Sequence, residues 1–331
     1  MAEAKQNIHN LKPVLSDHLR KFGAVYAFLL LVVVNAVSNS NFMSINTMWN
    51  LLIQAFPIII TSLGMLFVIS SGGIDVSVGS VMAVAGVMNA VIMNGIYPAF
   101  PKSLALGLVM AIVVSLLFGL FNGFMISVFK MQPIIVTLTT YIIARGLAQL
   151  LANGKILSFS NTPFAEVGIL RLPGNIPIQF IIEIAFILVA AFVIKRMVFG
   201  YQVQAIGENP QAAKLCGVKT TKVQIMVYMI SAFIAAIAGL LVSSRTIAAD
   251  PTNLGQLAEM DAIAAVAIGG TSMAGGKSKI MTTVISALII QLITITINMN
   301  NIHYAYARVL KGLIIIVAVY IQQDKSNKGG R

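Results

Sequence analysis

Long apolar runs separated by short polar segments dominate the hydrophobic pattern of this chain. An α-helix needs about 20 apolar residues to cross roughly 30 Å of hydrocarbon, and most of the runs reach or approach that length. We therefore expect an all-α, polytopic membrane protein with about ten transmembrane helices, some of them broken or short. The expected spans are Phe22–Val37, Trp49–Ser70, Ser77–Asn94, Ser103–Val128, Pro133–Ala152, Pro177–Ile194, Val223–Val242, Leu257–Ile268, Ile280–Asn298 and Tyr304–Ile321.

The composition leads to the same class of protein. Of the 331 residues, 58% are hydrophobic and only 10% are charged, and the mean hydropathy is +0.91. A soluble protein of this length needs more polar surface than so few charges can provide. Once the spans are removed, no soluble domain remains. We expect a cytoplasmic segment 1–21, a transmembrane domain 22–321 that contains an inside loop 195–222, and a cytoplasmic tail 322–331.

The basic residues are distributed unevenly between the two sides of the membrane. Of the 22 lysines and arginines, 15 fall in segments on the same side as both termini, and only Lys102, Lys155, Arg171 and Arg245 fall on the opposite side. The positive-inside rule therefore predicts cytoplasmic N- and C-termini. Because this topology accounts for the net charge of +12, we expect no nucleic-acid partner.

The composition also excludes several kinds of chemistry. The single cysteine, Cys216, cannot form an intramolecular disulfide, and the three histidines do not cluster with it, so we expect no metal and no cofactor. An intramembrane enzyme would need a nucleophile and a base, and no histidine lies in the interior of an expected span. The segment Gly270–Ser278 fails the phosphate-loop pattern by one residue, since Thr271 stands where a glycine is required.

Two glycine-rich octets, 72–79 and 269–276, interrupt the apolar runs and share a G-G-x5-G frame. Non-helical backbone at membrane depth is tolerated where it lines a cavity, and paired breaks of this kind commonly flank a transport route. A second interpretation is that the octets are tight connections, with Asp75 or Ser77 capping the next helix. The candidate pathway residues are Gly72, Gly73, Asp75, Ser77, Gly79, Glu259, Asp261, Gly269, Gly270 and Thr271.

Charged residues near the bilayer centre are costly and usually have a partner or a task. Glu259 and Asp261 precede a stretch of small residues, and the possible counter-charges are Arg145, Arg308 and Lys311. Two roles remain open for these groups, namely ion pairs that fix helix packing and direct contacts to a substrate. Glu183 lies in a span but near its end, where a long side chain can reach the interface, so we assign it no role.

The inside loop contains a short helical pattern. Asn209 is a good N-cap, Pro210 suits the first helical position, and Gly217 is well placed to end the helix in the left-handed region. A helix of about two turns is unstable alone, so it must pack on its own bundle or on a partner protein. The candidate coupling residues are Gly207, Asn209, Pro210, Ala213, Lys214 and Gly217.

Three ordered segments, 72–79, 207–217 and 259–276, together resemble the ribose-type family of bacterial ABC sugar-importer permeases over residues 50–321. The segments 131–138, 144–149 and 153–156 are most similar to the galactofuranose-type branch of that family. The chain departs from the family pattern at the basic segment 277–279 and in the residues around Glu259, but not at the motif glycines.

The resemblance implies a multi-pass permease subunit of the bacterial cytoplasmic (inner) membrane, surrounded by lipid, that carries a monosaccharide. The implied partners are an ABC ATPase subunit, which holds the ATP hydrolysis, a periplasmic or lipid-anchored sugar-binding protein, and a second permease subunit that is either identical or a paralogue. The resemblance also implies that the loop 207–217 contacts the ATPase.

Two alternatives stay open. The first is an ABC permease for a nucleoside, a branched-chain amino acid or an autoinducer. The second is an ion-coupled secondary transporter, in which Asp75, Glu259 or Asp261 would be a proton or sodium site.

Overall fold

The computed structural model describes residues 23–98, 101–159, 163–300, 302–303, 305–306, 308–313 and 316. The expected cytoplasmic segment 1–21, the tail 322–331 and part of the expected span Tyr304–Ile321 lie outside the described residues.

The described chain is mostly helical. Six of its helices, α2, α4, α5, α7, α10 and α12, are long and apolar enough to cross a membrane, and two shorter ones, Gly23–Ser38 and α3, are also apolar. The protein is therefore a polytopic, mostly helical membrane protein. The helices from α2 onward are α2 (Ile45–Ser70), α3 (Val78–Asn94), α4 (Leu104–Ser127), α5 (Pro133–Leu151), α6 (Pro163–Ile169), α7 (Ile178–Arg196), α8 (Val198–Glu208), α9 (Pro210–Leu215), α10 (Thr220–Thr246), α11 (Ala258–Ile268) and α12 (Ile280–Met299).

Four two-residue strands lie in the connections. Strands β1 (Leu157–Ser158) and β4 (Ala248–Ala249) form one antiparallel pair, with Leu157 opposite Ala249. Strands β2 (Arg171–Leu172) and β3 (Ile176–Pro177) form another. The first pair ties the segment after α5 to the segment after α10.

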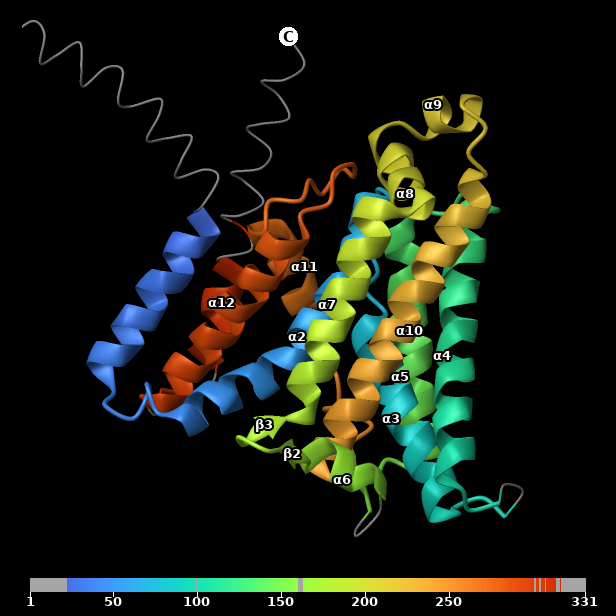
Figure 1. The fold of residues 1–331 in the computed structure, drawn as a ribbon. Coiled ribbons are helices and arrows are strands. Elements are labelled where there is room, and N and C mark those ends of the chain that lie inside the picture. Colours follow the sequence, from blue (N-terminus) through green and yellow to red (C-terminus); the bar gives the residue numbers. More distant parts are fainter. Residues whose placement is uncertain are drawn as a thin grey trace, which may run out of the picture.

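Helices α2, α3 and α10 form the centre of the bundle (Figure 1). Helix α10 packs against α2, α3 and α4, and α2 also contacts α7, α11 and α12. Helices α4, α5 and α7 turn rows of large apolar side chains outward, including Leu117, Ile142 and Leu188, each more than half exposed. An outer ring with apolar outer faces around a buried centre is the arrangement expected of a bundle surrounded by lipid.

Helix α2 bends at Pro57, and Figure 1 shows its first turns lying obliquely to the rest. Proline has no N–H, so the carbonyl of Ile53 loses its normal helical partner. The Arg245 guanidinium of α10 donates a hydrogen bond from Nη1 to that carbonyl at 2.8 Å. The bend is therefore stabilised by a neighbouring helix.

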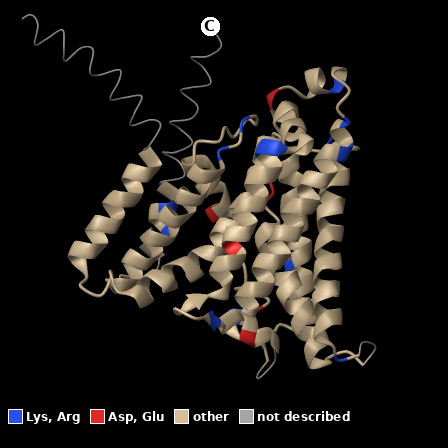
Figure 2. Cartoon of the chain, in the orientation of Figure 1, with Lys and Arg blue, Asp and Glu red and all other residues tan. Residues whose placement is uncertain are grey.

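The two ends of the bundle differ in charge. Helices α8 and α9 lie at one end, and α6, β2 and β3 lie at the other (Figure 1). Figure 2 shows that most of the lysines and arginines gather at the α8–α9 end. This asymmetry agrees with the distribution of basic residues along the sequence.

Two segments, which we call the α3 crossing (71–94) and the α11 crossing (248–268), are helical over only part of their length. Non-helical backbone precedes α3 and α11, and the two helices begin close together, because a Cβ placed on Gly79 would overlap the carbonyl of Gly255. The far end of α3 reaches β1, where Asn94 donates to the Ser158 carbonyl at 3.1 Å. The far end of α11 leads to Gly276, whose N–H donates to the Ser70 carbonyl. The two partial helices therefore run in opposite directions from a common midpoint.

Candidate functional site

In both glycine-rich octets, the first residues end the preceding helix with the same backbone geometry. Gly72 follows α2 with φ +83° and Gly270 follows α11 with φ +79°, a left-handed conformation that glycine adopts without strain. The N–H of Gly72 bonds to the Ile69 carbonyl and that of Gly270 to the Ala267 carbonyl, as in a Schellman motif. Gly72 is the first glycine of its pair but Gly270 is the second, so the structural equivalence is shifted by one residue from the G-G-x5-G frame.

The structure brings both octets into contact with the end of α8. A Cβ on Gly207 would overlap the Ser70 carbonyl and lie 2.5 Å from the backbone N of Gly276. A Cβ on Gly275 would lie 2.7 Å from the Gly207 carbonyl oxygen, and Gly72 also lies close to Gly207. We call these four residues (Gly72, Gly207, Gly275 and Gly276) the glycine junction. It joins the end of α2, the end of α8 and the connection from α11 to α12 without intervening side chains.

Asp75 is the centre of a buried polar network. Its Oδ1 accepts hydrogen bonds from the N–H and the hydroxyl of Ser77, and its Oδ2 accepts one from the Ser231 hydroxyl of α10 at 2.8 Å. The Asn122 amide of α4 donates to Ser77 Oγ, and the Thr140 hydroxyl of α5 donates to Asn122 Oδ1. Each of these side chains is at most 1% exposed. Asp75 therefore holds the start of α3 to α4, α5 and α10.

The remaining residues of the first octet are closely packed. Ser77 occupies the N-cap position of α3, but its side chain makes no capping bond to the helix backbone. A side chain on Gly73 would overlap the hydroxyl of Tyr228, and one on Gly79 would overlap Glu259 as well as Gly255. The first octet is thus a packed connection in this conformation.

Arg145 of α5 binds the backbone at the point where α3 and α11 begin. Its Nη1 donates to the carbonyls of Pro251, Thr252 and Leu254 at 3.1, 3.3 and 2.8 Å. Its Nη2 donates to the Gly79 carbonyl at 3.2 Å. A single guanidinium therefore cross-links the non-helical part of the α11 crossing to the first turn of α3.

Glu259 lies beside this cross-link, in the first turn of α11. Its side chain is 3% exposed, and no described residue donates a hydrogen bond to its Oε2. Arg145 is close enough to interact with it electrostatically. The sequence prediction of a counter-charge near Glu259 therefore agrees with the geometry, although the guanidinium hydrogen bonds go to the backbone.

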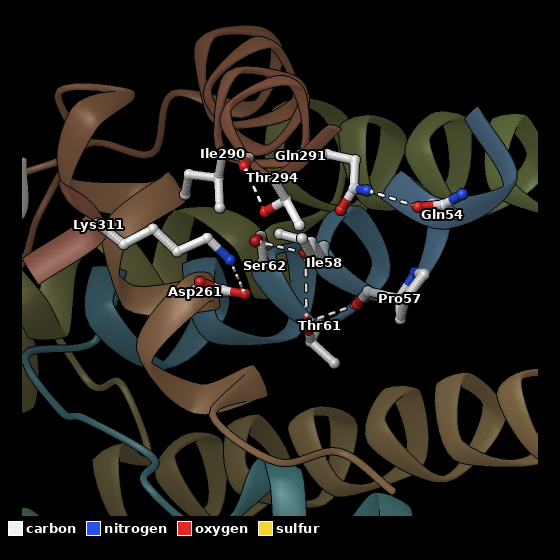
Figure 3. Close-up of polar contacts among 10 residues, drawn as sticks. All are labelled: Gln54, Pro57, Ile58, Thr61, Ser62, Asp261, Ile290, Gln291, Thr294 and Lys311. Atoms are coloured by element: carbon white, nitrogen blue, oxygen red, sulfur yellow. Dashed lines mark hydrogen bonds and ion pairs between the residues drawn. The ribbon is translucent and has the colours of Figure 1, made fainter. Parts of the chain in front are cut away.

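Asp261, two residues further along α11, has a different environment. Its Oδ2 accepts a hydrogen bond from Lys311 Nζ at 2.9 Å, and both side chains are less than one fifth exposed. Figure 3 shows this ion pair next to the bend of α2, with Gln54 and Gln291 joined nearby. The expected ion pair that fixes helix packing is present between Asp261 and Lys311.

The second octet anchors α11 to α12. Thr271 is fully buried and its Oγ1 accepts a hydrogen bond from the Lys279 N–H at 3.1 Å. The Gly269 carbonyl accepts one from the Thr282 hydroxyl at 2.6 Å, and a side chain at position 269 would crowd Thr283.

The loop helix α9 has the ends that the sequence predicts. Asn209 Oδ1 accepts hydrogen bonds from the N–H groups of Gln211 and Ala212, each at 3.0 Å, Pro210 is the first helical residue, and Gly217 has φ +82°. Ala213 is its one buried side chain, whereas Lys214 is exposed and the neighbouring Leu215 is 89% exposed. A helix with so little contact to its own bundle presents most of its surface outward.

Some residues that the site uses are not distinctive in the sequence. Asn122, Thr140 and Ser231 are single polar residues in apolar runs, and only their i, i+3 and i+4 neighbours hint that they face inward. Glu183 does not reach the interface as expected, because its side chain is 3% exposed. Gln179 lies one turn earlier on the same buried face of α7, and this spacing of two polar residues could have indicated that Glu183 faces inward.

Comparison with known proteins places the chain among transport subunits. Residues 47–319 match the family model described as "Branched-chain amino acid transport system / permease component". No solved structure matches the chain.

Curated relatives cover most of the chain. The ribose import permease protein RbsC of Haemophilus influenzae is 36% identical over 88% of this chain and 90% of its own length. The galactofuranose transporter permease protein YtfT of Escherichia coli is 34% identical over 83% of this chain and 79% of its own length. The fructose import permease protein FruF of Bifidobacterium longum is 33% identical, covering 98% of this chain and 94% of its own.

Proposed function

Because this chain belongs to the family of permease components of branched-chain amino acid transport systems, we propose that it is the membrane-spanning permease subunit of an ATP-driven (ABC) importer for a monosaccharide. The observation that carries the sugar assignment is the set of relatives, which are named for the import of ribose, galactofuranose and fructose. The six long apolar helices support a multi-pass protein of the bacterial inner membrane. The chain itself is a transport subunit, and ATP hydrolysis belongs to a separate ATPase.

The full topology has ten crossings with both termini in the cytoplasm. In this arrangement the α8–α9 end faces the cytoplasm, which is supported by the concentration of basic residues there (Figure 2). The α3 and α11 crossings each count as one span, although helix covers only part of each. Cysteine labelling from each side of the membrane, with Cys216 replaced by serine, tests the sidedness of positions 102 and 277.

The ATPase subunit docks on α9. The exposed Leu215 and the exposed Lys214 beside it give this helix one apolar and one basic side chain for contact with a partner. Gly207, Asn209, Pro210, Ala213 and Gly217 shape the helix and its attachment rather than its surface. A sugar-binding protein delivers substrate at the opposite end, and a second permease subunit completes the importer.

Transport proceeds by alternating access. The ATPase moves α9, and α8 transmits this movement to the glycine junction, where the end of α8 meets both octets. The candidate pathway residues flank these two breaks, and the α3 and α11 crossings pivot to open the route first to one side and then to the other.

Reconstitution tests this function. Vesicles that contain the permease, its ATPase and its binding protein should import labelled D-ribose, D-galactofuranose or D-fructose when ATP is supplied. Import of none of the three sugars, or undiminished import after the ATPase is omitted, would contradict the proposal. Leucine in the same assay tests the runner-up suggested by the family description, a permease for branched-chain amino acids.

An ion-coupled mechanism predicts a different result. If Asp75, Glu259 or Asp261 bound a driving ion, dissipation of the proton and sodium gradients would stop import even with ATP maintained. For an ATP-driven importer, we expect import to continue under those conditions.

A further inference from the structure

The three candidate pathway carboxylates differ in the hydrogen bonds that their oxygens accept. Asp75 accepts three hydrogen bonds from Ser77 and Ser231, and Asp261 is paired with Lys311. Glu259 differs from both, because its side chain is only 3% exposed and its buried Oε2 receives no hydrogen bond from a described residue. A buried acceptor without a donor is costly, so a structure that keeps one calls for a reason.

The free oxygen points to the place where the two partial helices begin. A Cβ on Gly79, in the first turn of α3, would overlap Glu259 Oε2, so only a glycine leaves room for the carboxylate there. Gly255, two residues before the N-cap of α11, touches the same turn of α3. The helices are 17 and 11 residues long, and their N-termini both carry partial positive charge.

The charges around Glu259 favour a neutral ligand over a cation. The Arg145 guanidinium and the two helix N-termini place positive charge beside the carboxylate, so a bound metal ion or ammonium group would be repelled by them. Asp261 and Asp75 also lie near Glu259. Asp261 is paired with Lys311, and Asp75 already accepts three hydrogen bonds. A hydroxyl group supplies the missing hydrogen bond without adding charge.

The contact between the beginnings of the two partial helices is made largely by glycine backbone, and beside it the Leu254 side chain packs against Gly86 of α3. Gly79 and Gly255 meet backbone to backbone, and the hydrogen bonds across the contact come from the single side chain of Arg145. Separation of α11 from α3 would therefore expose Oε2 directly to the space between them.

We propose that Glu259 is a substrate-contact residue whose Oε2 accepts a hydrogen bond from a hydroxyl of a neutral polyol as it passes between α3 and α11. This inference rests on the proposed sugar-import function and identifies the atom that recognises the substrate. It distinguishes Glu259 from Asp75 and Asp261, which hold the fold together.

Deoxy analogues of the sugar test the proposal in the complete reconstituted importer. The probes are D-ribose, D-galactofuranose or D-fructose, whichever the wild type imports, and the single-deoxy forms of that sugar. The wild type should prefer the parent sugar, and Glu259→Gln should reduce that preference by about tenfold for at least one analogue, because a bond to a charged acceptor is replaced by a weaker neutral one. The binding protein contributes equally in both importers and cancels in the comparison.

Glu183→Gln is the matched control. Glu183 has the same residue type, the same 3% exposure and an Oε2 that likewise receives no hydrogen bond from a described residue, but it lies on α7 away from the partial helices. We expect its preference ratios to equal those of the wild type.

Unchanged ratios in Glu259→Gln, or the same change in Glu183→Gln, would overturn the proposal. If Glu259→Gln does not assemble, Glu259→Asp keeps the charge and shortens the side chain, and unchanged ratios in that variant would overturn it equally. A wild type that imports none of the three sugars refutes the proposed function itself, and the inference falls with it.

Discussion

The α3 and α11 crossings share an architecture but differ in how their polar groups are satisfied. The α3 crossing is held by the Asp75 network, in which side chains from α4, α5 and α10 all donate toward one carboxylate. The α11 crossing is held by backbone contacts and by Arg145, and it keeps a buried carboxylate oxygen without a donor. The comparison indicates that the α3 crossing is held more firmly than the α11 crossing, so we expect the α11 crossing to make the larger movement, and we call them the fixed and the moving crossing.

The largest effect should come from Gly207, the α8 residue that touches both octets. Gly207→Ala would overlap the Ser70 carbonyl and crowd Gly276, so α8 must move away from both octets. We expect import to fall by at least about tenfold while ATP hydrolysis by the complex continues, since α9 itself is unchanged. Import and hydrolysis are measured on the same vesicles.

Gly146→Ala is the control for that variant. Gly146 lies inside α5, and a Cβ there would meet nothing within 4 Å. Import at the wild-type rate is expected. Equal losses in both variants would show that the glycine junction has no special role.

The next largest effect should come from the fixed crossing. Asp75→Ala leaves the Ser231 hydroxyl and the Ser77 N–H without their acceptor in a fully buried site. We expect a loss of about 3 kcal/mol in the free energy of unfolding, measured by denaturant titration in detergent. The exposed Glu166→Ala should change it by less than about 0.5 kcal/mol. A similar value for both variants would remove the distinction between the crossings.

A smaller effect should come from the moving crossing. Arg145→Lys keeps the positive charge but cannot reproduce a fork that binds four carbonyls. We expect about 2 kcal/mol of destabilisation, together with faster amide hydrogen exchange in residues 250–258 than in 73–78. The same substitution at the exposed Arg171 should change neither quantity. Equally faster exchange in both crossings would mean that the α3 crossing depends on Arg145 as strongly as the α11 crossing does.

The smallest effect should come from the ion pair at the edge of the moving crossing. Lys311→Met removes the partner of Asp261, and both side chains remain partly exposed. Because partly exposed ion pairs contribute little, we expect a loss of about 1 kcal/mol in the same titration. A much larger loss would mean that Asp261 anchors α11 as firmly as Asp75 anchors α3.

The sequence predicted the membrane class, the positions of the long helices and the ends of α9, because each has a local signal, although α2 and α10 extend three or four residues beyond the predicted spans. Apolar runs of sufficient length predict spans, and the Asn-Pro and glycine signals bound α9. The two octets were also identified as interruptions. The shared glycine frame does not state which glycine takes the left-handed conformation, and in the structure the equivalent glycines are offset by one residue.

The contacts between distant segments could not be predicted from local pattern. Nothing in the sequence near Gly207 indicates that it lies against Ser70 and Gly276. The sequence around Arg145 likewise does not indicate that its hydrogen-bond partners are carbonyls some 106 residues later. Ser231 and Asn122 became part of the site only through the packing of α4 and α10 around Asp75. Tertiary packing decides such contacts.

The proline bend in α2 has a consequence for how force crosses the bilayer. Because Arg245 binds the Ile53 carbonyl, the two parts of α2 are held at an angle to each other, so the helix does not transmit movement as a straight rod. Because Ser70 lies against the end of α8, a displacement of α8 along the later part of α2 would move the part before Pro57 sideways. In the proposed topology, the displacement would begin on the cytoplasmic side and reach the opposite side of the membrane as a lateral movement.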